Sequence, residues 1–149
     1  MLKELTLAFL ERELATLDQS VLEEFRITKL EHKDLNLFVW FLSKPCEGGA
    51  HPYLLLLDAV EYPERAMHGI FLNPETREPG LNWWPEDYGG TSIFRSKNNP
   101  QFICAPSFRT WETVGGHGRP SSPDEWKLYR VLEAVWLGLN APSYEGYHK

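Results

Sequence analysis

The chain has few of the residues that mark several specialised protein classes. Its 149 residues include only 2 cysteines, and no Cys-x-x-Cys or close Cys/His pair is present to form a zinc site. Apolar runs such as residues 53–57 are far too short to cross a bilayer, and the N-terminal segment is too charged for a signal peptide. We therefore expect a cytoplasmic protein with two reduced thiols and no metal or organic cofactor.

The chain also has fewer basic than acidic residues. Lysine and arginine total 15 against 21 acidic residues, which gives a net charge of -6. This balance argues against broad affinity for nucleic acids or for anionic membranes, so we expect neither as a partner. A hydrophobic content of 42% and a charged content of 24% are those of an ordinary globular chain. The length predicts a single domain over residues 1–149.

The hydrophobic pattern predicts an α+β fold that begins and ends with a helix. Residues 2–17 carry leucines at helical spacing. Short segments rich in β-forming residues follow and predict a four-stranded antiparallel meander: 25–30, 35–42, 53–60 and 67–72. Residues 73–99 show no regular pattern, and a long irregular segment of this kind is often functional. The capping box that begins at Ser122 predicts the start of the last helix, which ends at Asn140.

One cysteine stands at a marked place in this order. The strand-like triplet 101–103 leads to Cys104, and Ala105-Pro106 then stops the strand. Such a thiol is either a buried residue at a strand end or a nucleophile at the rim of a cleft. Cys46 lies in a turn rich in proline and glycine, where we expect no chemistry.

The order of motifs resembles that of the ubiquitin-conjugating enzymes over most of the chain. The matching features are Tyr62-Pro63 after the third strand, Ile103-Cys104, Trp111, and a helix with Leu128, Val131, Leu132 and Val135 that ends at Asn140-Ala141-Pro142. The His-Pro-Asn tripeptide that precedes the family's cysteine is absent, and its double proline is Ala66-Met67 here. In these departures the chain looks like the compact bacterial relatives. Some of those are encoded in anti-phage defence islands called CBASS, beside a nucleotidyltransferase that makes cyclic nucleotides.

This resemblance implies a protein-conjugating enzyme. Cys104 would carry the C-terminal carboxyl of a partner protein as a thioester and pass it to an amine. The family's oxyanion-stabilising asparagine would be Asn98 or Asn99, and His117, at the place of the family's gate residues, would assist proton transfer. The implied partner has a flexible C-terminal tail and is either a CBASS-type nucleotidyltransferase or a ubiquitin-like protein. An activating enzyme would act upstream unless the system is a reduced one.

Two other readings remain open. One is a catalytically inactive module of the same fold that binds peptides or ubiquitin-like domains, which the loss of the His-Pro-Asn tripeptide favours. The other is an unrelated α+β hydrolase with a Cys–His pair. The hydrolase would require the sulfur of Cys104 to lie within about 4 Å of a histidine ring nitrogen.

Overall fold

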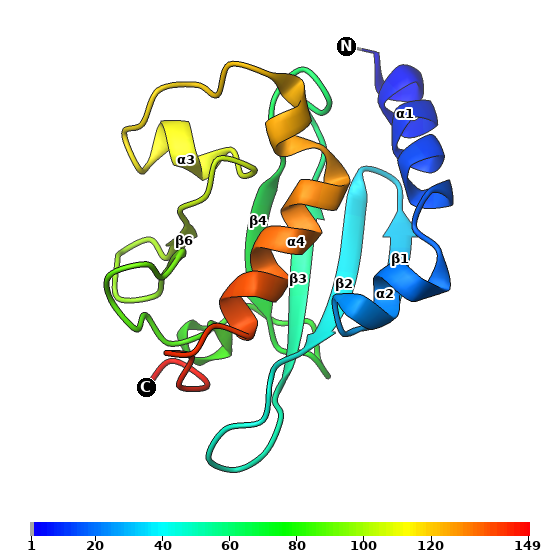
Figure 1. Cartoon of the computed structure of the whole chain (residues 1–149). Helices are drawn as coiled ribbons and strands as arrows, with labels where there is room; N and C mark the ends of the chain where they lie inside the picture. The colour runs from blue at the N-terminus through cyan, green and yellow to red at the C-terminus, as the bar shows by residue number, and fades with distance from the viewer. Residues whose placement is uncertain (1) are drawn as a thin grey trace.

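The computed structural model describes residues 2–149 and has the α+β architecture predicted from the sequence (Figure 1). Four antiparallel strands form one sheet in the order β1-β2-β3-β4, so the predicted meander is confirmed. The strands are β1 (Ile27–Lys33), β2 (Asn36–Leu42), β3 (Pro52–Asp58) and β4 (His68–Leu72). Helices α1 (Lys3–Ala15) and α2 (Gln19–Glu24) precede the sheet, and α4 (Leu128–Leu139) lies across one of its faces.

The pleat of the sheet explains which face α4 covers. Along β2, Leu37, Val39 and Phe41 are buried while their neighbours are half-buried, as expected when successive side chains point to opposite faces. They share one core with the inward stripe of α4, in which Val131 and Val135 are fully buried. The longest helix, α1, has 13 residues, and within residues 2–149 no helix has the length and apolarity that a membrane crossing requires.

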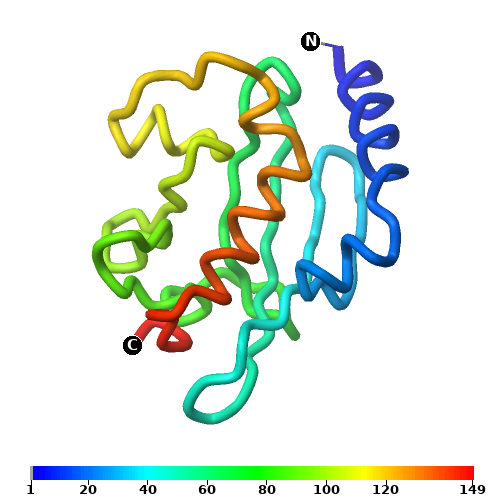
Figure 2. The backbone as a smooth tube through the Cα atoms, viewed as in Figure 1, coloured from blue at the N-terminus to red at the C-terminus, as the bar shows by residue number. Residues whose placement is uncertain are grey.

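The long segment between β4 and α4 lies on the β4 side of the sheet, opposite α1 and α2 (Figure 2). It contains the 3-10 helix η1 (Leu81–Trp83), a small hairpin of β5 (Phe94–Arg95) and β6 (Phe102–Ile103), and helix α3 (Thr110–Thr113). Gly69 of β4 makes room for this segment, because a Cβ there would lie 2.5 Å from the ring of Phe108. Phe108 therefore packs directly on the sheet and fixes the chain just after Cys104.

The start of the last helix differs from the prediction. The hydroxyl of Ser122 does accept a hydrogen bond from the amide of Asp124, at 3.3 Å, but the turn that follows is the 3-10 helix η2 (Pro123–Trp126). Trp126 is buried and its indole donates to the carbonyl of Pro63 at 2.9 Å. The extended backbone of Lys127 then separates η2 from α4. Anchoring of Trp126 in the interior thus interrupts the helix that the capping box predicts.

Residues from distant parts of the chain cap the N-terminus of α4 instead. The amide of Leu128 donates to the hydroxyl of Tyr62 at 3.0 Å and to the carboxylate of Glu13 at 3.2 Å. Tyr62 in turn donates to Glu13, and Thr6 of α1 donates to the carbonyl of Tyr62 at 2.8 Å. This junction ties α1 and the turn after β3 to the first residue of α4. Burial raises the pKa of Glu13 above its ordinary value.

The Glu13→Gln variant should change how stability depends on pH. Because the pKa of Glu13 is raised by folding, the folded protein holds this proton more tightly than the unfolded chain does. The free energy of unfolding of the wild type, relative to the variant, should therefore fall as pH rises from below 4.5 through the raised pKa. Urea unfolding at several pH values measures this difference. The exposed Glu24→Gln variant is the control, and parallel profiles for wild type and Glu13→Gln would contradict the prediction.

Candidate functional site

Backbone contacts on both sides of Cys104 hold it in place. Its amide donates to the carbonyl of Ile93 at 2.7 Å, which continues the pairing of β5 and β6 by one residue. The carbonyl of Ile103 accepts a hydrogen bond from the hydroxyl of Thr110 at 2.6 Å. After Cys104, the carbonyl of Ala105 accepts from the amide of Phe108 at 2.9 Å and closes a turn. The position of the thiol is therefore set by the fold rather than by a free loop.

The thiol is covered rather than open. Cys104 is only 8% exposed, although it is not among the residues of the main core cluster. A Cβ built on Gly115 would lie 3.2 Å from the sulfur of Cys104 and 3.1 Å from Cδ2 of His117. The thiol and the imidazole thus flank the same glycine. We call residues 114–118 the covering loop, because the backbone of Gly115 lies against the sulfur so closely that a Cβ there would make a tight contact.

Trp111 of α3 holds the covering loop. The imidazole of His117 stacks on its indole, with ring centroids 3.8 Å apart and an interplanar angle of 15°. The indole nitrogen of Trp111 donates to the carbonyl of Gly118 at 3.2 Å, and the amide of His117 donates to the carbonyl of Trp111 at 3.1 Å. The amides of Val114 and Gly115 also donate to the carbonyl of Thr110 at 3.1 and 2.9 Å. The loop is thus fastened to α3 by one stacked pair and four hydrogen bonds.

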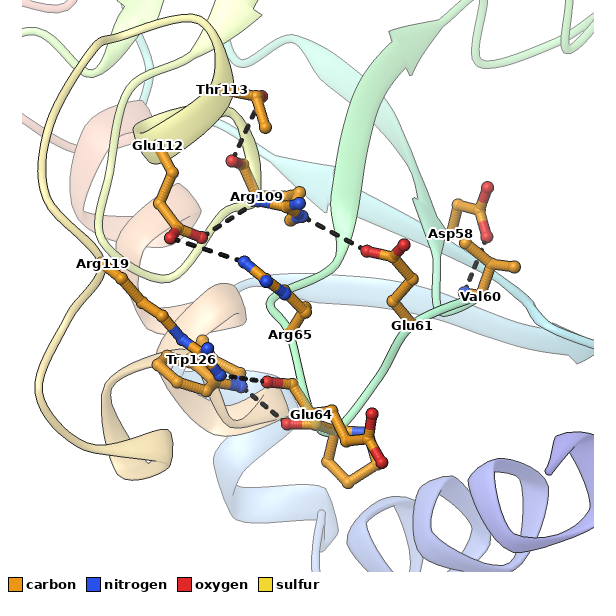
Figure 3. Close-up of polar contacts among 11 residues, drawn as sticks. Asp58, Val60, Glu61, Glu64, Arg65, Arg109, Glu112, Thr113, Arg119 and Trp126 are labelled. Carbon is orange, nitrogen blue, oxygen red and sulfur yellow. Dashed lines mark hydrogen bonds and ion pairs between the residues drawn. The ribbon is translucent and has the colours of Figure 1, made fainter. Parts of the chain in front are cut away.

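Ion pairs attach α3 to the turn after β3, and a hydrogen bond attaches Arg119, the residue that follows the covering loop, to the same turn (Figure 3). Arg109 and Glu112 pair at 3.0 Å, and their side chains are only 16% and 17% exposed. Further ion pairs join Glu112 to Arg65 at 3.8 Å and Arg109 to Glu61 at 3.4 Å. Beyond the loop, Arg119 lies over the ring of Trp126 and donates to the carbonyl of Glu64 at 2.7 Å. Because Arg109 and Glu112 are largely shielded from water, their pair is screened less than an exposed one.

The two asparagines lie at the opposite end of the hairpin from the thiol. The β5–β6 pairs run from Arg95 with Phe102 to Phe94 with Ile103, and Cys104 continues them away from the connecting loop. Asn98 and Asn99 are in that loop, and both are exposed. Asn99 lines a separate cavity of about 410 Å³, beside Ile70, Leu81 and Trp84. The structure thus brings His117 to Cys104 and places both asparagines at the other end of the hairpin.

A groove runs beside the residues that follow Cys104. Two adjoining cavities of about 390 and 370 Å³ share Ala105, Pro106 and Ala134 in their walls, so they lie between this segment and α4. Ser107 also lines the first of them. Sequence reasoning did not single out Ser107, because a lone serine near a cysteine carries no pattern that indicates a role.

The thiol and the imidazole of the site are not hydrogen-bonded to each other. Among the described residues 2–149, neither the sulfur of Cys104 nor a ring nitrogen of His117 has a hydrogen-bond partner. The contact that defines a Cys–His hydrolase is therefore not made in this conformation. Within the same residues, no group of three or more His, Cys, Asp or Glu side chains is arranged to hold a metal ion.

Comparison of the chain with protein-family models, with curated proteins and with solved structures finds no match. The resemblance to the ubiquitin-conjugating enzymes therefore depends on this chain alone, on the order of its motifs and elements and on the place of Cys104 among them.

Loosening the covering loop should make Cys104 more reactive. In a Cys46→Ser background, we expect iodoacetamide to alkylate folded Cys104 at least ~10-fold more slowly than a cysteine in a short peptide, because the thiol is covered. His117→Ala removes the stack on Trp111 and should raise the rate roughly two- to tenfold. Intact-mass spectrometry measures both rates. His32→Ala, on the far strand β1, is the control, and equal rates for His117→Ala and its parent would show that the loop does not limit access.

Proposed function

We propose that this protein is a conjugating enzyme that carries the C-terminal carboxyl of a partner protein as a thioester on Cys104 and transfers it to an amine. The observation that carries this proposal is the place of Cys104. It follows the hairpin strand β6, under the covering loop and directly before Ala105 and Pro106, which line a groove along α4. The meander and the final helix of the fold come in the order of elements that the resemblance to ubiquitin-conjugating enzymes implies.

The reaction needs two acyl transfers at one sulfur. The thiolate of Cys104 attacks an activated acyl group, the new S–C bond forms, and the leaving group departs with the proton that the thiol lost. An amine then attacks the thioester, the S–C bond breaks, and the thiol recovers a proton from that amine. A free thiol has a pKa of about 8.5, so only a few per cent is thiolate at neutral pH, but sulfur is nucleophilic enough for exchange from an activated acyl group.

His117 is the residue best placed to move the second proton. Its ring lies at Gly115 beside the thiol, and both ring nitrogens are without hydrogen-bond partners among residues 2–149. The ring can therefore accept the proton of the attacking amine while its stack on Trp111 fixes its plane. The oxyanion role that the resemblance gives to Asn98 or Asn99 requires the tip of the β5–β6 hairpin to fold toward the thiol.

Acyl transfer also requires the covering loop to move, because the thiol has little access in the closed arrangement. The loop contains Gly115, Gly116 and Gly118, and Gly116 has a positive φ of 71°. Glycine backbone changes conformation at low steric cost, so the loop is suited to open when a partner binds. Its attachments to Trp111 and Arg119 would act as the points about which it moves.

The proposed partner presents a flexible C-terminal tail that reaches the sulfur. The setting that the resemblance suggests is bacterial anti-phage defence, with a cyclic-nucleotide synthase as the partner and an activating enzyme upstream. A net charge of -6 favours a partner with a basic contact surface.

A second candidate function has its own support. The low exposure of Cys104 and the missing His-Pro-Asn tripeptide both suit an inactive module of the same fold that binds a peptide or a ubiquitin-like domain. Such a module would bind its partner without forming a covalent bond, so acyl transfer distinguishes the two candidates.

An acetyl thioester of benzyl mercaptan, with a lysine amide as acceptor, tests the enzyme directly. We expect the Cys46→Ser protein to form a hydroxylamine-sensitive acetyl adduct on Cys104 and to transfer the acetyl group to the lysine side chain. Cys104→Ala should lose both, because no nucleophile remains at the site. Peptide mapping by mass spectrometry locates the adduct. Transfer that persists in Cys104→Ala, or a folded Cys46→Ser protein that forms no adduct, would rule out the proposed enzyme activity and favour the binding module.

A further inference from the structure

The cavity of about 410 Å³ that Asn99 lines has no part in the proposed acyl transfer. It lies between Ile70 and Phe71 of β4, the segment around η1, and the residues that lead into β6. Neither Cys104 nor His117 lines it. Its volume falls within the range of about 300–1,000 Å³ that is typical of pockets for small molecules. The cavity is therefore a candidate site for a ligand that is unrelated to the thiol.

The walls of this cavity carry no charge. Among the described residues 2–149, no Asp, Glu, Lys, Arg or His side chain lines it. Its polar side chains are the two amides of Asn99 and Gln101. The apolar part of the lining consists of Ile70, Phe71, Pro79, Leu81, Trp84 and Pro100. Since an enclosed charge without a partner is costly, these walls favour a neutral ligand with an apolar body.

Trp84 offers a free hydrogen-bond donor to the cavity. The residue is only 4% exposed, and its ring packs edge-on against Phe71, with centroids 5.2 Å apart. Its indole nitrogen has no hydrogen-bond partner within residues 2–149, but it is not fully enclosed, because the fully enclosed unpaired side-chain atoms in that range are Oγ of Ser96 and of Ser107. The nitrogen thus keeps accessible surface, and the cavity is what Trp84 lines. The indole N–H of a buried tryptophan usually has a partner, so this donor indicates a ligand.

Gln101 supplies a free acceptor in the same lining. Its side-chain nitrogen donates to the carbonyl of Leu81 at 3.0 Å and to the carbonyl of Ser96 at 2.9 Å. Both N–H bonds of the amide are used, which fixes the end of the group that carries the oxygen. Oε1 of Gln101 accepts no hydrogen bond within residues 2–149. The cavity lining therefore combines a free donor on Trp84 with a free acceptor on Gln101.

We propose that this cavity binds a small neutral molecule that has an aromatic body and a cyclic amide, or lactam, at one edge. The indole N–H of Trp84 donates to the lactam carbonyl, and the lactam N–H donates to Oε1 of Gln101. A flat aromatic ring fits between apolar walls that include Pro79 and Pro100, and it loses little conformational entropy on binding. The proposal does not depend on the conjugating function, because the reacting residues lie outside the cavity.

Carbostyril, a neutral bicyclic lactam, is the probe for this site. In the proton–nitrogen correlation spectrum of isotope-labelled protein, each tryptophan indole gives a signal, and Trp84→Phe identifies the signal of Trp84. We expect carbostyril to shift this signal saturably, with a Kd of about 1 mM or lower. N-methyl carbostyril keeps the carbonyl but cannot donate to Gln101, so it should bind about fivefold more weakly.

A charge in the lining tests the same site without disturbing the core. Leu81 is 66% exposed, so Leu81→Asp should fold, and it should bind carbostyril at least ~10-fold more weakly because the wall is no longer apolar. Leu5→Asp is the matched control, since Leu5 of α1 is 56% exposed and does not line the cavity. It should bind as the parent does.

Three results would overturn the proposal. If the Trp84 signal shows no saturable shift, or if Leu81→Asp binds as tightly as the parent, the cavity is not the binding site. Equal binding of carbostyril and its N-methyl derivative would overturn the lactam edge. A peptide also carries amide groups, so acetyl-tetra-alanine amide is titrated in parallel. Tighter binding of this peptide than of carbostyril would assign the cavity to a peptide and overturn the small-molecule class.

Discussion

The contact of Leu128 with Glu13 and Tyr62 is the constraint on which the rest of the structure depends. It joins the first residue of α4 to α1 and to the turn after β3, so the helix that covers the sheet is fixed at its start by residues far away in the sequence. From the same turn, ion pairs hold α3 and a hydrogen bond holds Arg119, so the turn fixes the residues on both sides of the covering loop. One turn of the meander thus positions both the core helix and the loop over Cys104. A shift of this turn would therefore also move the loop that covers the thiol.

Firmly held and loosely held parts follow each other along the segment between β4 and α4. The backbone around Cys104 is held by Ile93 and Thr110, and Phe108 packs on the sheet at Gly69. The covering loop beyond it is exposed, and a stack and a few hydrogen bonds fasten it. Such elements open at lower free energy than the packed core does. A thiol fixed on the rigid part and covered by the loosely held part is protected until the loop moves.

The sequence was enough for the sheet and for the two long helices, because their hydrophobic patterns repeat over enough residues to be recognised. The sequence did not predict α2 and α3, which have 6 and 4 residues, because helices of that length show no hydrophobic periodicity. The capping box at Ser122 was a correct local signal, but burial of Trp126 outweighed it. For the site, chain order placed His117 beside Cys104. It could not show that hairpin pairing carries Asn98 and Asn99 to the other end, because strand register is a tertiary property.

Two features that count against a resting catalyst fit together if the site is completed by its substrate. The thiol is covered, and a hydroxyl three residues away is buried without a partner. The unpaired hydroxyl costs free energy in the free protein, whereas the covered thiol does not, because cysteine packs as a small apolar residue. A partner tail that bound next to Cys104 would gain free energy, and that gain would offset the breaking of the stack between His117 and Trp111. Binding of the correct tail, rather than random opening, would then expose the sulfur, and Cys104 would stay protected from other acyl donors.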